Sequence, residues 1–250
     1  MADRMVLALI GGSVVESMPG FVEDGATRAG TPWGEPSAAI RAGRLCGARV
    51  LWLARHGEPH AIAPHRINYR ANLHALQVCG ATHVLALHAV GGIAATAAPG
   101  TLWLPDQLID YTWGRAGSFH DGEQQALAHI EFAEPFDAAL RAQLRAAAAA
   151  CAIVLQPHGI YGCTQGPRLE TAAEIGRMQR DGCELVGMTA MPEAALAREL
   201  GLAYASLSMV VNRAAGLAEA PITMKAIRSE AAACVERIGR VVAELLRAPG

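Results

Sequence analysis

The sequence predicts a single α/β domain in which short apolar strands alternate with helices. Three apolar runs, Met5–Ile10, Val50–Ala54 and His83–Leu87, each end in glycines or polar residues, as strands buried on both faces of a sheet do. From 159 to 212, extended and helical patterns alternate, which is typical of a largely parallel sheet. No Pro/Ser-rich linker or run of charges marks a boundary, so we expect residues 1–250 to form one domain.

The composition argues against several classes of function. The net charge is only −2 and no basic cluster occurs, which is unlike a protein that binds nucleic acid or a membrane surface. The six cysteines form no CxxC pair and are scattered through apolar segments, so we expect a reduced, cytoplasmic protein. The N-terminal run MVLALI is too short for a signal-peptide core or a membrane span.

The first strand leads into a candidate anion site. Met5–Ile10 is followed by Gly11, Gly12 and Ser13. Two glycines let the backbone turn tightly and present N–H groups to an anion, and the serine hydroxyl adds a donor. An ordinary strand-ending turn is the alternative. A dinucleotide fingerprint fits poorly, because GGSVVES lacks GxGxxG.

The second strand is followed by Arg55 and His56, in RHGEPH. A guanidinium fork beside an imidazole suits a phosphate, which arginine binds bidentately. His56, His60 and His65 could instead be metal ligands, but their spacing matches no defined metal site. We therefore expect no metal.

A helix over Asn68–Cys79, stopped by Gly80, precedes the third strand. That strand runs from His83–Leu87 into His88, Ala89 and a pair of glycines, which again allow the backbone to approach an anion. His88 is equally compatible with a buried, hydrogen-bonded histidine of structural importance.

The middle of the chain is less regular. LWLPDQLIDYT, within residues 99–136, favours strand and turn, and Ser118–Glu134 is polar enough for a surface excursion. Ala146–Ala150 is typical of an alanine-rich helix.

The segment that follows carries most of the polar groups at element boundaries. Pro167 suits the first turn of a helix that runs to about Gly182. Glu170, near the positive end of that helix, should stay ionised and therefore accept hydrogen bonds only.

The next strand, Leu185–Met188, ends at Thr189, and Pro192 and Glu193 open another helix. In parallel α/β sheets, ligands bind at the carboxyl ends of strands, where Thr189 and Asn212 lie. The last segment predicts a helix with one apolar face made by Ala231, Cys234, Ile238, Val241 and Leu245.

Several ordered motifs carry a resemblance. GPRLET, GMTAMPE and VVN, with IGGS near the start and ITMKAI near the end, resemble the purine nucleoside phosphorylase and methylthioadenosine phosphorylase family, and within it the bacterial enzymes that act on S-methyl-5′-thioinosine. The resemblance extends over nearly the whole chain. It implies a phosphorylase-type fold, with a mixed, partly barrel-like central sheet flanked by helices.

The resemblance also implies a phosphate site. Many relatives have threonine at the position of His88, which leaves the role of that side chain open, and Ala89 would act through its backbone N–H. The implied phosphate-binding residues are Ser13, Arg55, His56, His88, Ala89 and Thr189.

Two residues would determine which purine is bound. Methylthioadenosine phosphorylases resemble this chain but carry serine at the position of Glu170 and aspartates at those of Asn212 and Ala214. An ionised Glu170 would accept the N–H at ring position 1 of a 6-oxopurine and repel the lone pair of adenine, and Asn212 would donate to the carbonyl or to ring nitrogen 7. These differences indicate a 6-oxopurine base.

At the sugar, the resemblance places Met188 beside the ribose and Met224 where phosphorylases for ordinary nucleosides have a histidine for the 5′-hydroxyl. A methionine there would pack against a methylthio group, and Ile227 can line the same pocket. Met224 as plain core filler is the alternative. His129 matches a position that reaches into a neighbouring subunit, which implies a homotrimer, although a simple loop histidine is also consistent with the sequence.

The implied reaction is phosphorolysis of an N-glycosidic bond, with hypoxanthine and 5-methylthioribose 1-phosphate as products. Asn212 and Glu170 would stabilise the leaving base, while phosphate, held by His56 and its neighbours, attacks the anomeric carbon. Phosphate is a co-substrate, and we expect no cofactor. The alternatives are a general inosine/guanosine phosphorylase, a methylthioadenosine phosphorylase, a nucleosidase, and a nucleoside-binding protein with a decayed site.

Overall fold

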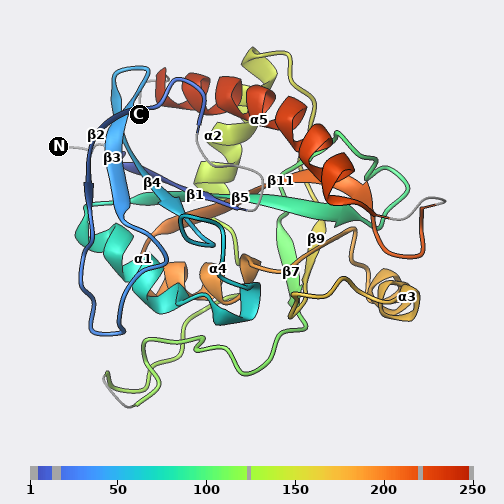
Figure 1. Ribbon diagram of the computed structural model, residues 1–250, viewed down its shortest axis with the longest axis horizontal. Coiled ribbons are helices and arrows are strands. Elements are labelled where there is room, and N and C mark those ends of the chain that lie inside the picture. Colours follow the sequence, from blue (N-terminus) through green and yellow to red (C-terminus); the bar gives the residue numbers. More distant parts are fainter. Residues whose placement is uncertain (1–4, 13–17, 123–124, 219–221, 248–250) are drawn as a thin grey trace.

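The computed structural model describes residues 5–12, 18–122, 125–218 and 222–247 (Figure 1). Within these ranges, eleven strands form one sheet. They are β1 (Leu7–Gly11), β2 (Val22–Thr27), β3 (Ile40–Leu45), β4 (Ala48–Ala54), β5 (His83–Gly92), β6 (Leu102–Trp103), β7 (Gln107–Asp110), β8 (Leu155–Gln156), β9 (Ile160–Cys163), β10 (Leu185–Gly187) and β11 (Ala203–Arg213). The helices are α1 (Tyr69–Val78), α2 (Ala138–Ala150), α3 (Ala172–Arg180), α4 (Ala190–Glu199) and α5 (Met224–Arg247), with a 3-10 turn η1 (Pro64–Arg66).

The sheet is built around β5. This strand pairs in parallel with β1 from His83 to Ala86 on one edge, and with β11 over its whole length on the other. Its side chains alternate between two apolar clusters, with Leu85 in one and Val84 in the other. Helices therefore cover both faces of β5, which explains its continuous apolar sequence.

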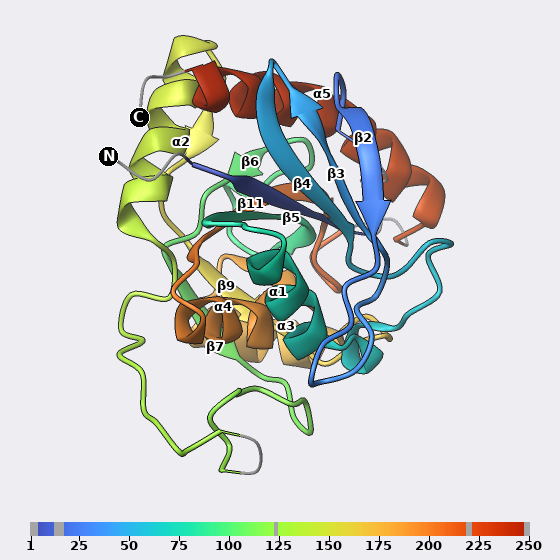
Figure 2. The same cartoon turned by 90° about the vertical axis from the view of Figure 1, so that its left-hand side faces the viewer.

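The helices form two layers. In Figures 1 and 2, α5 and α2 lie above the sheet, and α1 and α4 lie below it. Leu140 of α2 and Ile238 of α5 belong to the first apolar cluster, and Leu73 of α1 and Leu196 of α4 belong to the second. The predicted apolar face of the last helix is buried in full, at Ala231, Cys234, Ile238, Val241 and Leu245.

One edge of β5 changes partner halfway along. Pairing with β1 ends at Ala86, and β10 pairs antiparallel with Gly91 and Gly92. Because β11 occupies the opposite edge throughout, β1 and β10 share this edge and run toward each other. Residues Leu87–Val90 are called the β5 gap from here on, because no strand within the described residues pairs with them on that side.

Beyond β5 the sheet continues through β10, β9 and β7, and separately through β11, β6 and β8. In Figure 1, β7 and β9 stand steeply across β5 and β11, which shows how strongly the sheet curls. This mixed sheet flanked by helices confirms the predicted fold class. A single domain over residues 1–250 stays a prediction.

Two element boundaries differ from those expected, and a third agrees. The helix predicted to start at Pro167 begins at Ala172, because Thr171 and Glu174 form a capping box. Pro167 and Glu170 therefore precede α3 rather than lie in its first turn. The strand predicted to end at Leu87 continues to Gly92, since β11 pairs with it that far. In α4, Met191 has non-helical dihedral angles, so regular turns begin at Pro192, as the sequence predicted.

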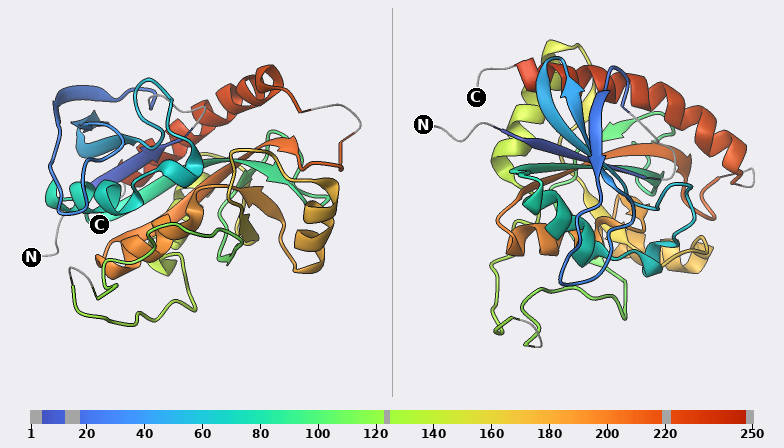
Figure 3. Two further views of the ribbon diagram at one scale, coloured as in Figure 1. Left: turned by 60° about the horizontal axis from the view of Figure 1, so that its bottom comes forward. Right: turned by 60° about the vertical axis from the view of Figure 1, so that its left-hand side comes forward.

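The chain between β7 and α2 is a long excursion without helix or strand in its described residues, 111–122 and 125–137, as predicted for its polar part. Figure 3 shows it extending away from the sheet. The buried rings of Phe119 and Phe136 anchor it to the core. Among the helices in the described part of the chain, none is both long and apolar enough to cross a bilayer.

Candidate functional site

A buried ion pair lies beside the β5 gap. Arg55 follows β4, and its Nε and Nη2 donate to the two carboxylate oxygens of Glu193 at 2.8 and 2.9 Å. Both side chains are at most 1% exposed. Burial alone would lower the pKa of Arg55, but the charge and hydrogen bonds of the Glu193 carboxylate raise it above its usual value. Tyr204 also donates to Glu193, at 2.9 Å.

The remaining contacts of Arg55 point to the gap. Nη1 donates to the Leu87 carbonyl at 3.1 Å, and Nη2 lies 3.3 Å from Nε2 of His88. A guanidinium has five N–H groups, so these contacts leave one on Nη1. A Cβ built on Gly12 would lie 3.1 Å from Nη1, which places this N–H beside the turn after β1. Ser13, the next predicted ligand, lies outside the described residues.

His88 is held entirely by protein groups. Its Nδ1 lies 2.8 Å from the Ser206 hydroxyl, which in turn lies 3.0 Å from that of Ser208. Burial, aided by the positive charge of Arg55, lowers the pKa of His88 well below its usual value. The neutral ring therefore accepts from Arg55 and donates to Ser206. A contact between this ring and phosphate stays a prediction.

His56 is fixed in one orientation. Its Nδ1 donates to the Ile62 carbonyl at 2.7 Å, and its ring packs against that of His60, with centroids 4.4 Å apart. Burial lowers the pKa of His56 to about 4; the bond to Ile62 opposes this shift and the nearby Arg55 charge adds to it. At neutral pH, Nε2 is therefore a hydrogen-bond acceptor.

Ala89 lies within the β5 gap, and Thr189 follows β10, the strand that pairs with β5 beyond it. Backbone groups two residues apart on a strand face the same edge, so the N–H of Ala89 faces the same edge as the Leu87 carbonyl that Arg55 contacts. Thr189 follows β10, is 6% exposed, and its hydroxyl makes no capping bond. Arg55, which follows β4, and the backbone of β5 therefore present hydrogen-bonding groups at the gap, and Gly12 lies beside Arg55. A contact between Thr189 and phosphate stays a prediction.

Of the predicted base-binding residues, Glu170 lies on the loop before α3 and Asn212 lies near the end of β11. Glu170 is half-buried, and its Oε1 accepts a hydrogen bond from the Thr164 hydroxyl at 2.6 Å. Asn212 sits at a bulge in β11 opposite Gly91 and donates to the Arg213 carbonyl at 2.7 Å. The loop after β11 packs against Ala172 at the start of α3, because a Cβ on Gly216 would lie 2.5 Å from it.

Glu170 also lines a cavity of about 460 Å³ between the segment after β7 and the start of α3. Its other walls include Trp113, Thr164 and Gln165. Ala214 is buried in the apolar cluster under α3, and Met188 is half-buried. A Cβ on Gly166 would lie 2.6 Å from the Met188 sulfur, so this glycine allows the two loops to meet.

Three further predicted residues lie on α5 and on the long excursion. Met224 opens α5 and is 56% exposed, so it is not core filler. Ile227 is half-buried and packs against the apolar cluster under α5. His129 is exposed in the long excursion. Their roles in binding stay predictions.

Comparison with known proteins decides the family. The family model described as "Phosphorylase superfamily" matches residues 6–247. This chain belongs to the phosphorylase superfamily. It is 49% identical to a probable S-methyl-5′-thioinosine phosphorylase of Xanthomonas campestris, over 98% of this chain and 99% of the other. It is 41% identical to a 6-oxopurine nucleoside phosphorylase of Pyrococcus furiosus, over 87% and 83%.

Solved structures agree with this assignment. A methylthioadenosine phosphorylase from Schistosoma mansoni in complex with adenine superposes with a TM-score of 0.92 at 29% identity, covering 97% of this chain and 91% of that one. The resemblance recognised from the motifs is therefore confirmed, and this phosphorylase is an enzyme of the nucleoside phosphorylase type.

Three residues that organise the site have no role in the prediction from sequence. The sequence predicts Glu193 only as a member of GMTAMPE and at the start of a helix, because its burial beside Arg55 depends on tertiary packing. Thr164 directly precedes the loop to Glu170. Arg115, in the long excursion, donates to the carbonyls of Met188, Met191, Thr164 and Gln165 and so joins the two loops. In the sequence, Arg115 lies between the predicted strand and turn and the polar segment Ser118–Glu134, and no pattern there indicates a role for it.

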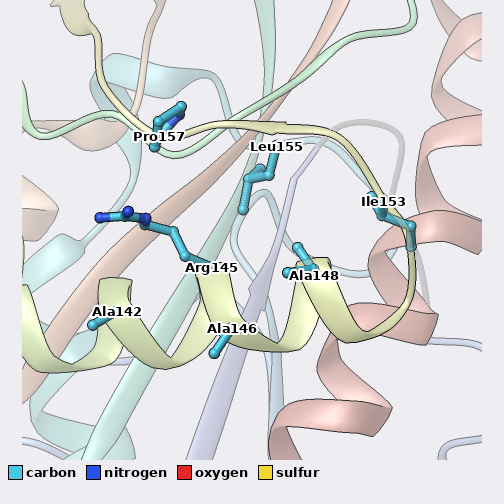
Figure 4. Close-up of a pocket in the computed structure, with 8 residues that line it drawn as sticks. Ala142, Arg145, Ala146, Ala148, Ile153, Leu155 and Pro157 are labelled. Carbon is cyan, nitrogen blue, oxygen red and sulfur yellow. The ribbon is translucent and has the colours of Figure 1, made fainter.

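A second hollow of this phosphorylase, of about 590 Å³, lies elsewhere. Figure 4 shows it between α2 and the chain that returns through Leu155 to Pro157. Alanines of α2 form much of its wall, and Arg145 is its charged side chain. It contains none of the predicted site residues. Among the described residues, no group of three or more His, Cys, Asp or Glu side chains is arranged to hold a metal ion.

Proposed function

We propose that this phosphorylase cleaves S-methyl-5′-thioinosine with inorganic phosphate, giving hypoxanthine and 5-methylthioribose 1-phosphate. The names of relatives such as the Xanthomonas enzyme support this substrate. The observation that carries the base preference is the carboxylate of Glu170, whose Oε1 is occupied by Thr164.

At the base, Glu170 and Asn212 contact different groups of the purine. Oε2 of Glu170 accepts the N–H at ring position 1 of hypoxanthine, and adenine would present a lone pair there instead. Of the two N–H groups of the Asn212 amide, one donates to Arg213 and the other donates to the carbonyl or ring nitrogen 7 of the base. These contacts stabilise charge as it moves onto the leaving purine.

At the sugar, phosphate occupies the β5 gap. The free N–H of Arg55, the backbone N–H of Ala89 and the hydroxyls of Thr189 and Ser13 donate to it. The His56 ring is neutral at pH 7, so its Nε2 accepts a hydrogen bond from a protonated oxygen of phosphate. Phosphate held in this way attacks the anomeric carbon as the bond to the base breaks, and Met188 packs beside the ribose.

We extend the proposal to a cytoplasmic homotrimer without an organic cofactor. The exposure of His129 on an excursion that leaves the body of the protein supports a role in a neighbouring subunit. Mixing His129→Ala chains with Glu170→Ala chains tests this, because shared sites would restore activity to a mixture of two inactive proteins. Light scattering gives the subunit number.

The deciding experiment is purine release from methylthioinosine, methylthioadenosine and inosine, each with and without phosphate. Phosphate-dependent release fastest from methylthioinosine supports the proposal. Fastest release from inosine would favour a general 6-oxopurine phosphorylase, which the Pyrococcus relative makes the second candidate. Fastest release from methylthioadenosine would refute the assignment of Glu170 and Asn212.

A further inference from the structure

The Thr164 hydroxyl is placed to control how Glu170 faces the base. Thr164 follows β9 and is 8% exposed. Its Oγ1 lies 2.6 Å from Oε1 of Glu170 and 3.3 Å from the Gly187 carbonyl. A hydroxyl has one hydrogen to donate, and the charged oxygen at the shorter distance is the stronger acceptor.

The backbone of Thr164 is fixed independently of this bond. Its N–H donates to the Gly187 carbonyl at 2.8 Å, which ties it to the end of β10. Its own carbonyl accepts from Arg115 at 3.2 Å, and Arg115 also holds the Met188 carbonyl at 2.9 Å. The hydroxyl therefore projects from a rigid point, whereas Glu170 lies on the loop before α3.

We propose that Thr164 is a positioning residue for base selection: its hydroxyl occupies Oε1 of Glu170 and leaves Oε2 to accept the ring N–H of a 6-oxopurine. This inference rests on the proposed function. Without the hydroxyl, the carboxylate can rotate, and either oxygen can turn to solvent. The loss of kcat/KM should affect 6-oxopurines, because only their ring N–H donates to the Glu170 carboxylate.

The test compares Thr164→Val, Thr164→Ser and Thr164→Ala through the ratio of kcat/KM for methylthioinosine to that for methylthioadenosine. Valine keeps the shape and removes the hydroxyl, so the ratio should fall about tenfold, the lower end of the effect of losing a hydrogen bond to a charged group. Serine should keep the ratio within about threefold of the parent, while alanine should behave like valine.

A second-site background and a control variant separate a positioning role of Thr164 from a general loss of structure. In Glu170→Ala, Thr164→Val should leave the ratio unchanged, because the acceptor it orients is absent. Thr82→Val is the matched control: the Thr82 hydroxyl contacts Val6 and His83 at the opposite end of β5, and its loss should not alter the ratio. Calorimetric binding of hypoxanthine in the presence of phosphate gives a readout independent of turnover.

An unchanged ratio in Thr164→Val, or an equal fall in the Glu170→Ala background, would overturn the inference. A parent enzyme without preference for methylthioinosine would instead overturn the proposed function. Weaker hypoxanthine binding by both valine and alanine variants, with serine close to the parent, would support the role of the hydroxyl even in that case.

Discussion

Removing the charge of Glu193 tests whether the buried ion pair holds the phosphate site in place. Glu193→Gln keeps the size of the side chain but leaves Arg55 charged, 1% exposed and without its carboxylate. Removing one partner of such a pair costs about 3–5 kcal/mol. Glutamine keeps one acceptor oxygen, so one or two of the three hydrogen bonds to the carboxylate, from Arg55 twice and Tyr204 once, are lost together with the charge, which is consistent with that range. At about 2–4 °C per kcal/mol for a chain of this length, Tm should fall by about 6–20 °C.

The assay combines urea unfolding with kinetics. Because Arg55 loses its orientation, we expect the KM for phosphate to rise about tenfold more than the KM for the nucleoside. A tenfold change corresponds to the loss of about one hydrogen bond between Arg55 and phosphate. Glu174→Gln is the matched control, since Arg168 contacts both its oxygens at 2.7 and 2.8 Å but both residues are solvent-exposed. That change should cost less than about 1 kcal/mol. Equal stability of Glu193→Gln and the parent, with unchanged phosphate KM, would refute the reasoning.

Three further predictions concern single positions. The pKa of His56 is about 4 in the folded chain, against an ordinary value of 6.5. Between these pH values the unfolded chain binds more protons than the folded chain, so the free energy of unfolding should fall by up to about 3 kcal/mol as the pH drops from 6.5 to 4. Urea unfolding of His56→Asn should show a flatter dependence of stability on pH than the parent, and an identical dependence would contradict the assignment. Asn212→Asp should shift preference toward 6-aminopurines, and an unchanged adenine-to-hypoxanthine ratio would remove Asn212 as a base reader. Met224→His should improve inosine relative to methylthioinosine, since it supplies a partner for the 5′-hydroxyl; identical ratios would place Met224 outside the 5′ pocket.

Local pattern was sufficient for much of the fold. The apolar runs at β1 and β4 and the face of α5 are periodic features that sequence alone can identify. The strand that ends at Gly92 was read as stopping at Leu87, because paired glycines usually mark a turn. Only the presence of β11 on the adjoining edge, which is a long-range contact, extends it.

For the site, sequence could name residues but not their partners. The sequence predicts that the guanidinium of Arg55 binds phosphate bidentately. In the structure, Nε and Nη2 donate to Glu193 instead, and the contacts of Arg55 leave a single N–H, on Nη1. No local signal distinguishes a buried glutamate from an exposed one at the start of a helix. Thr164 and Arg115 are likewise defined by contacts between segments far apart in the chain, which periodicity and spacing do not encode.

The position of β11 affects how the protein reaches its native state. Since β11 covers one whole edge of β5, a nascent chain that has not yet reached residue 203 carries an apolar central strand with open hydrogen-bonding groups. Such pairings between distant segments form slowly, and an uncovered strand of this kind is a template for aggregation. The centre of the sheet is therefore unprotected until residues 203–213 have been synthesised, and a chain cut short before β11 would expose one whole edge of β5.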